Sequence, residues 1–140
     1  MQKIKYFLYI VLIFISIDIV NAKSFGSTEY QEVLLSFKKG MMQNTINSFS
    51  SYLSDNCYIS LNNGTTGYYT TSQSYYIFEN YFSQYTVFDL RFDEINKGSQ
   101  SINASGIMKY YFNGAKNSTG VFVSIKNISG LWYISQIIIN

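Results

Sequence analysis

The spacing of hydrophobic residues changes several times along the chain, and the first regular spacing is helical. From Glu29, which follows the possible cap residues Ser27 and Thr28, apolar side chains recur at positions i, i+3, i+4 and i+7. They are Tyr30, Val33, Leu34, Phe37 and Met41. Gly40 lies near the end of this stripe, where glycine commonly ends or bends a helix. A second stripe of the same kind covers residues 42–53, so we predict two helices joined at Gly40 or one long helix bent there. The members of the second stripe are Met42, Ile46, Phe49 and Leu53.

After these stripes, apolar residues recur at every second position instead of at helical spacing. Cys57, Ile59 and Leu61 alternate with other residues as in a half-buried strand, and the sequence Asn-Asn-Gly at residues 62–64 is typical of a turn. We therefore predict a strand that ends at this turn.

The segment GYYTTSQSYYIFENYF, residues 67–82, contains the start of a further helix. Thr70 and Gln73 have the spacing of a capping box, in which the threonine hydroxyl accepts from the Gln73 amide and the glutamine side chain reaches back. We predict that the polar residues 70–74 begin the helix and that residues 67–69 are extended. The residues at helical spacing are Ser74, Ile77, Phe78, Tyr81, Phe82 and Tyr85.

From Thr86 onward the interval is two again, and it predicts four strands separated by polar segments. The predicted strands cover residues 86–93, 107–112, 121–126 and 131–139. A polar connection at residues 96–105 and turns at residues 113–114, 117–120 and 127–130 join them. Helices followed by a run of strands are typical of α+β folds, so we predict helices packed on one face of a curved antiparallel sheet.

Residues 1–22 have the features of a signal peptide. Lysines near the start are followed by an almost wholly apolar run at residues 6–17, and small or aliphatic side chains precede a cleavage point after Ala22. The run is shorter than the roughly 20 residues that a spanning helix requires. We predict export and a single periplasmic or secreted domain, residues 23–140. The alternative is that residues 1–22 are not cleaved and anchor the domain to a membrane.

The composition argues against several classes of function. The chain has no histidine, the commonest general base and transition-metal ligand. Cys57, the only cysteine, has no cationic neighbour in sequence and is predicted to be a small buried hydrophobe. Lys38 and Lys39 are the only cluster of basic residues in the predicted domain, so we predict no nucleic-acid partner. Asp93 and Glu94 are too few ligands for a metal ion, and no sequence motif predicts a cofactor.

Several stretches of the chain resemble the nuclear-transport-factor-2-like superfamily, whose domains are cone-shaped α+β folds of the cystatin-like type. They are the two helical stripes around Gly40, SSYLSDNCYISL and GVFVSIKNISGLWYISQIII. More narrowly, GYYTTSQSYYIFENYF resembles a family of uncharacterised exported proteins of Bacteroidota-type bacteria. The resemblance covers about residues 29–139, and it implies a fold rather than a chemistry. Some members of the superfamily are enzymes that hold a small hydrophobic molecule in the cone and move protons with Asp, His or Tyr.

Aromatic residues on several predicted elements are candidates for lining a pocket between the sheet and the helices. The candidates are Tyr75, Phe88, Phe92, Tyr111 and Trp132. The alternative is that these side chains simply fill the core of a small domain.

The strand at residues 86–93 has a predicted apolar face and a predicted charged face. Phe88, Leu90 and Phe92 are expected on the concave wall. The opposite face carries Val87, Asp89, Arg91 and Asp93. Carboxylates that share a face with an arginine are more typical of solvated ion pairs than of a catalytic dyad.

The last predicted strand is apolar on both faces. Its predicted faces are Ile134 and Ile138 on one side and Leu131, Tyr133, Ile137 and Ile139 on the other. One face belongs to the core, and the other must be covered by the chain itself in a monomer or by a partner. The resemblance implies sheet-to-sheet homodimers as one solution.

The sequence thus predicts an exported, non-catalytic binding domain. Its ligand is expected to be a small apolar or amphipathic molecule in the cone, or a protein partner on the sheet. One alternative is an enzyme of the same fold with Asp89 or Asp93 as base and a tyrosine hydroxyl that polarises the substrate. The other alternative is a structural subunit of an envelope assembly.

Overall fold

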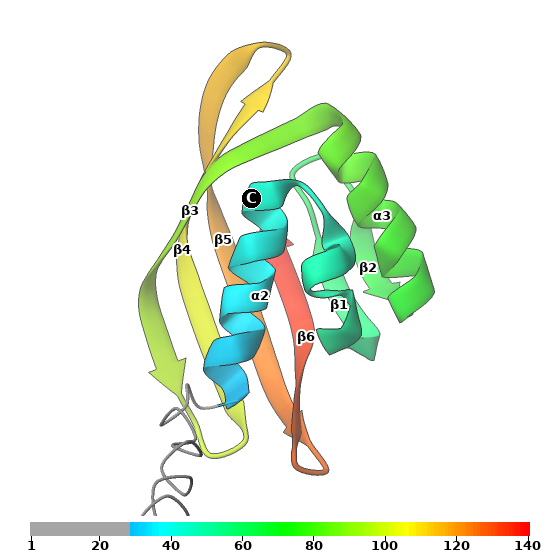
Figure 1. Cartoon of the computed structure of the whole chain (residues 1–140), viewed down its shortest axis with the longest axis vertical. Helices are drawn as coiled ribbons and strands as arrows, with labels where there is room; N and C mark the ends of the chain where they lie inside the picture. The colour runs from blue at the N-terminus through cyan, green and yellow to red at the C-terminus, as the bar shows by residue number, and fades with distance from the viewer. Residues whose placement is uncertain (1–28) are drawn as a thin grey trace, which may run out of the picture.

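The protein, represented by a computed structural model, is described over residues 29–140 and consists of a helical layer on a curved sheet (Figure 1). The helical layer contains α2 (Glu29–Gln43), the short 3-10 helices η1 (Ile46–Ser48) and η2 (Ser50–Tyr52), and α3 (Thr71–Gln84). The strands are β1 (Leu53–Ser60), β2 (Thr66–Tyr69), β3 (Tyr85–Lys97), β4 (Ser101–Phe112), β5 (Ala115–Ile128) and β6 (Leu131–Ile139). Within this part of the chain, no helix is long and apolar enough to cross a membrane. The predicted signal peptide and its cleavage point lie outside the described residues.

The six strands form one open sheet in the order β2-β1-β6-β5-β4-β3. The pair β1 and β6 is parallel, whereas the other neighbouring pairs are antiparallel. This arrangement confirms the predicted α+β fold with helices on one face of a curved sheet. The sheet is mixed rather than wholly antiparallel because the last strand enters between β1 and β5 in the direction of β1.

The first predicted helix continues beyond Gly40 to Gln43. The second predicted helix is wrong, because two short 3-10 helices and the start of β1 occupy its residues. Helix α2 continues through Gly40, which is buried against the ring of Phe49. A Cβ atom at residue 40 would also lie 2.7 Å from the carbonyl oxygen of Thr45. This glycine therefore permits close packing and does not end the helix. Asn44 follows α2 with a φ of 54°, and the apolar residues of the second stripe lie on η1, η2 and the start of β1.

The side chain of Asn44 also fixes the position of β3. Its Oδ1 atom accepts from the Val87 amide at 2.7 Å, and its Nδ2 atom donates to the Val87 carbonyl oxygen at 3.1 Å. The asparagine amide thus takes the place of a neighbouring strand at the open edge of the sheet, where unpaired backbone groups would otherwise be exposed.

The capping box that begins α3 is confirmed. The Gln73 amide donates to Thr70 Oγ1 at 3.3 Å, and the Thr70 amide donates to Gln73 Oε1 at 3.0 Å. Helix α3 then buries Phe78 and Tyr81 against the sheet.

Two segments predicted as connections are strand. Residues 96–105 contain the ends of β3 and β4 around a short reversal, and residues 117–120 lie inside β5. Residues 117–120 are polar and at least partly exposed because the hairpin of β4 and β5 runs past the helical layer (Figure 1). In the first segment, by contrast, Ile102 and Ala104 are buried in the core. The turns predicted at residues 113–114 and 127–130 are confirmed, with positive φ angles at residues 113, 114, 129 and 130.

Irregularities in strand pairing change which residues face the helices. On β3 the register shifts between Val87 and Asp89, so Val87 is buried and Phe88 is exposed, opposite to the predicted faces. On β6, Ile125 pairs with Ile134 and Ser124 with Gln136, which leaves Ser135 as an extra residue. A bulge of this kind resets the alternation of a strand. The predicted faces of β6 are therefore wrong, because Ile134, Ile137 and Ile139 are all buried while Ile138 faces the other side.

Candidate functional site

The predicted pocket residues lie in four different places. Tyr75, Phe92 and Trp132 are partly buried at separate positions around the hydrophobic core. Trp132 makes an edge contact with Tyr30, and Phe92 packs near Phe37 with 6.4 Å between ring centroids.

The other two pocket candidates, Phe88 and Tyr111, form a separate surface pair. Their ring centroids are 4.8 Å apart, and the Lys116 ammonium lies about 6 Å from both rings. The structure therefore does not bring the five candidates together around one cavity.

The space between the helices and the centre of the sheet is filled by side chains. Phe49 packs edge-on against Phe37 and Phe78, with centroid distances of 5.1 and 5.3 Å, and all three rings have no exposed surface. Leu90 and Ile134 continue this core on the sheet and are equally buried. At this position the aromatic residues act as core.

The carboxylates of the predicted alternative enzyme lie in ion pairs at the surface. Asp89 Oδ2 is 3.1 Å from Lys109 Nζ, and Asp93 Oδ1 is 2.6 Å from Arg91 Nε. The four side chains are between two fifths and two thirds exposed. Hydrogen bonding to Asp93 is the main cause that raises the pKa of Arg91. Neither carboxylate lies in the aromatic core.

Buried tyrosine hydroxyls are satisfied by an asparagine that sequence reasoning placed only in a turn. Tyr81 Oη donates to Asn62 Oδ1 at 3.0 Å, and Asn62 Nδ2 donates to Tyr110 Oη at 3.1 Å. Burial is the main cause that raises the pKa of Tyr81. The requirement that a buried tyrosine find a partner was the available signal for this network.

Cys57 is fully buried on β1, which confirms its interpretation as a small hydrophobe. Burial raises the pKa of its thiol to about 12, so the nucleophilic thiolate is not formed at neutral pH. Among residues 29–140, no group of three or more Cys, Asp and Glu side chains is placed to hold a metal ion.

The face of the sheet opposite the helices carries five apolar side chains, which we call the outer apolar patch. Its members are Tyr58, Tyr68, Ile107, Phe122 and Ile138. Tyr58 and Tyr68 are strand partners with 5.1 Å between ring centroids, and Phe122 and Ile138 are also partners. Tyr58, Phe122 and Ile138 each lie between two residues that are buried on the helical side, and no helix covers the patch (Figure 1). Tyr68 is 67% exposed and Ile107 38%.

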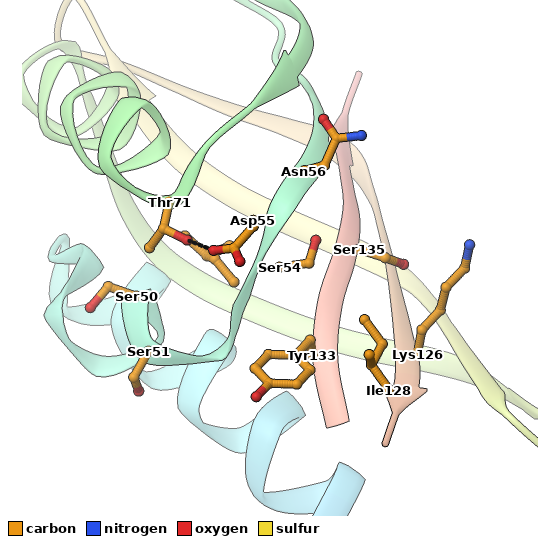
Figure 2. Close-up of a pocket in the computed structure, with 11 residues that line it drawn as sticks. Ser50, Ser51, Ser54, Asp55, Asn56, Thr71, Lys126, Ile128, Tyr133 and Ser135 are labelled. Carbon is orange, nitrogen blue, oxygen red and sulfur yellow. Dashed lines mark hydrogen bonds between the residues drawn. The ribbon is translucent and has the colours of Figure 1, made fainter. Parts of the chain in front are cut away.

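A second surface feature, which we call the β1–β6 groove, lies where these two strands separate (Figure 2). Leu53 pairs with Ile134 and Tyr58 with Gln136, so four residues of β1 lie opposite Ser135 alone. The resulting groove has a volume of about 650 Å³. It is lined by Ser50, Ser51, Leu53, Ser54, Asp55, Asn56, Thr71, Lys126, Ile128, Tyr133 and Ser135.

Hydroxyl groups dominate the β1–β6 groove. Thr71 Oγ1 donates to Asp55 Oδ1 at 3.5 Å, and Ser135 Oγ donates to the Ser124 carbonyl oxygen at 3.2 Å. The buried Ser54 Oγ atom has no hydrogen-bond partner within the described chain. Sequence reasoning missed this groove, because it assigned the 3-10 segment to a helix and did not predict the parallel pairing that leaves the gap.

Comparisons with known proteins agree on the fold and leave the chemistry open. The model of a family described as a domain of unknown function, DUF4783, matches residues 30–140. None of the curated proteins that were searched matches the chain.

Solved structures with the same fold include members of that family. A DUF4783 protein from Bacteroides uniformis is 14% identical with a TM-score of 0.64, and the match covers 76% of this chain and 94% of the other. One from Bacteroides ovatus is 14% identical with a TM-score of 0.62, covering 74% and 90%. A candidate polyketide cyclase from Pseudomonas putida is 12% identical with a TM-score of 0.60, covering 81% and 92%. Other solved structures that match are described as having a cystatin-like fold or as nuclear-transport-factor-2-like. At these identities the likenesses establish the fold alone.

Proposed function

We propose that this chain, which belongs to the DUF4783 family of unknown function, is an exported, non-catalytic binding domain that docks a protein on the outer face of its sheet. The partner we favour is a second copy of the chain. Export is part of the proposal and depends on the signal-peptide features of residues 1–22.

The observation that carries this proposal is the outer apolar patch. It contains two cross-strand pairs, Tyr58 with Tyr68 and Phe122 with Ile138. The two pairs are offset diagonally on the same face, because Tyr58 lies opposite Gln136 and Ile138 opposite Ser60. Ile107 is likewise two residues along β4 from Ser105, the partner of Phe122. Contiguous exposed apolar surface on a sheet is a common site of protein association, and tyrosine is enriched in such interfaces.

The charges beside the patch favour a second copy over a strongly charged partner. The pairs Asp89–Lys109 and Arg91–Asp93 on β3 and β4 present both signs in equal number. A two-fold interface brings the same surface together with itself, so a balanced set of charges can complement its own copy.

The placement of the carboxylates supports the non-catalytic interpretation. A general base works within hydrogen-bond reach of a bound substrate, usually in a site that excludes water. Asp89 and Asp93 are instead paired with cations in solvent. The filled centre of the cone likewise gives little support to an internal apolar ligand.

The oligomeric state of the purified protein tests the proposal. We expect sedimentation velocity of the protein expressed from its full sequence to show a concentration-dependent dimer. The variant Phe122→Glu should be monomeric, because it places a charge in the patch without altering the core. Leu35→Glu is the matched control, since Leu35 is exposed on α2 and lies outside the patch. A wild-type protein that remains a monomer, or a dimer that both variants weaken equally, would contradict the proposed interface.

Native mass spectrometry of the same sample separates this proposal from an internal ligand. A dimer mass equal to twice the chain mass supports the interface. An additional mass that disappears on denaturation would instead favour a small molecule bound in the cone.

A further inference from the structure

The β1–β6 groove is built by strand irregularity rather than by a loose surface loop. In β1, residues 54–57 pass opposite the single residue Ser135, and β2 begins its pairing only at Cys57. The two ends of the gap are fixed by regular pairing at Leu53 and Tyr58. The groove is therefore held open by the fold itself, and its volume of about 650 Å³ lies within the roughly 300–1,000 Å³ usual for ligand sites.

The lining of the groove combines polar side chains with a larger share of apolar surface, and its charges are balanced. Serine, threonine and tyrosine hydroxyls come from η2, β1, α3 and β6, and Asn56 adds an amide. Its charged groups are one carboxylate, Asp55, and one ammonium, Lys126. A hydroxyl can both donate and accept, so this lining suits a ligand that itself carries many neutral donors and acceptors.

Ser54 adds a further hydroxyl beside the groove. Its Oγ atom is buried and has no hydrogen-bond partner among the described residues.

Aromatic residues continue the groove on both sides of Ser51, which lines all three adjoining depressions. On one side a depression of about 390 Å³ includes Tyr52 and Trp132. On the other side a depression of about 440 Å³ includes Tyr75 and Tyr76, which pack edge to face with centroids 6.0 Å apart. The arrangement is a polar centre between two aromatic ends.

From this arrangement we infer that the β1–β6 groove binds a neutral oligosaccharide. A sugar ring offers hydroxyls around its edge and a C–H face that packs on aromatic rings, which matches the polar centre and the aromatic ends. An anionic ligand would require more cations than Lys126, and an apolar ligand would leave the hydroxyls unpaired. The groove is distinct from the outer apolar patch, so this inference does not depend on the proposed dimer.

Trp132, the only tryptophan in the chain, provides a reporter inside the site. We would titrate the protein with maltohexaose, cellohexaose, xylohexaose and chitohexaose and follow tryptophan fluorescence and calorimetric heat. At least one of these sugars should give a saturable signal in both measurements. A neutral hexapeptide of serine, asparagine and glycine serves as the competing ligand class.

Ser51→Arg should weaken sugar binding by at least about tenfold, because it fills the junction of the three depressions. Tyr76→Ala, which removes a 71% exposed ring at one end, should weaken binding to a smaller extent. Ser118→Arg makes the same substitution at an exposed position of β5 away from the groove and should leave affinity unchanged. Circular dichroism verifies that each variant is folded.

The inference is overturned if none of the four sugars binds at about 10 mM, where even weak millimolar sites are largely occupied. It is also overturned if the peptide binds and the sugars do not. A sugar affinity that neither Ser51→Arg nor Tyr76→Ala reduces would equally reject this groove as the site.

Discussion

The two faces of the sheet are made by neighbouring residues of the same strands, yet they have different chemistry. Towards the helices, Val123, Ile134 and Ile137 are completely buried in a continuous core. Towards solvent, Phe122 and Ile138 are partly exposed beside serine, asparagine and charged side chains. The chain buries its aliphatic residues on one face and leaves an amphipathic surface on the other, which is where we place recognition.

Adjacent isoleucines on β6 give the sharpest test of this difference. Ile137→Ala should lower the free energy of unfolding by about 2–5 kcal/mol, because it leaves a cavity in the core. Ile138→Ala should lower it by less than about 1 kcal/mol, since a partly exposed side chain can be replaced without a cavity. Urea unfolding at a protein concentration low enough to keep any dimer dissociated measures both. Equal losses would show that the two faces do not differ in packing.

The strand faces were only partly predictable from sequence, because the alternation is broken by bulges. In β6 the extra residue Ser135 places Ile134 and Ile137 on the same face although they are three residues apart. In β3 the shift near Phe88 has a similar effect. A prediction that continues strict alternation through such a bulge places the residues that follow it on the wrong face.

Local signals predicted best those elements that depend on local contacts. Thr70 and Gln73 identify the start of α3, since both hydrogen bonds of the capping box lie within four residues. The β1–β6 groove had no such signal, because it arises where residues 54–57 meet Ser135, far away in the sequence. The sequence predicted a second apolar face on the last strand, but only Ile138 of β6 belongs to the outer apolar patch. Its other members come from four other strands, and grouping them required the observed register.

A second prediction concerns Gly106 on β4, which lies opposite the second irregularity of β3. A Cβ atom at this position would collide with the carbonyl oxygen of Arg91 and lie 2.8 Å from Cα of Phe92. We expect Gly106→Ala to destabilise the fold by about 1–3 kcal/mol through backbone displacement. The neighbouring variant Ser105→Ala should change stability by less than about 0.5 kcal/mol. Thermal unfolding followed by circular dichroism distinguishes them, and a Gly106→Ala protein as stable as wild type would contradict this view of the strand pair.

A third prediction uses Cys57, a residue of the buried face, as a pH probe. Burial raises the pKa of its thiol from 9.0 to about 12, so the folded state holds the thiol proton more tightly than the unfolded state does. The associated stability is fully present below pH 9 and is lost as the pH rises towards 12. Within that interval the free energy of unfolding should fall by at most about 1.4 kcal/mol per pH unit.

The control for this prediction is Cys57→Ala, which lacks the titrating group but retains the tyrosines. Urea unfolding at several pH values should give a steeper decline for the wild type than for the variant. Parallel declines would show that the thiol is not the group responsible.

The smallest effect is expected on the outer face, at the cross-strand pair of Asp89 and Lys109. Their charged atoms are 3.1 Å apart, but both side chains are more than two fifths exposed, so water and salt weaken the attraction. Lys109→Met should therefore change the free energy of unfolding by less than about 1 kcal/mol, and high salt should reduce the difference further. Denaturant unfolding at low and high ionic strength measures this directly. A large loss that persists in salt would mean that Asp89 is held in a desolvated setting, and the enzyme alternative with Asp89 as base would regain support.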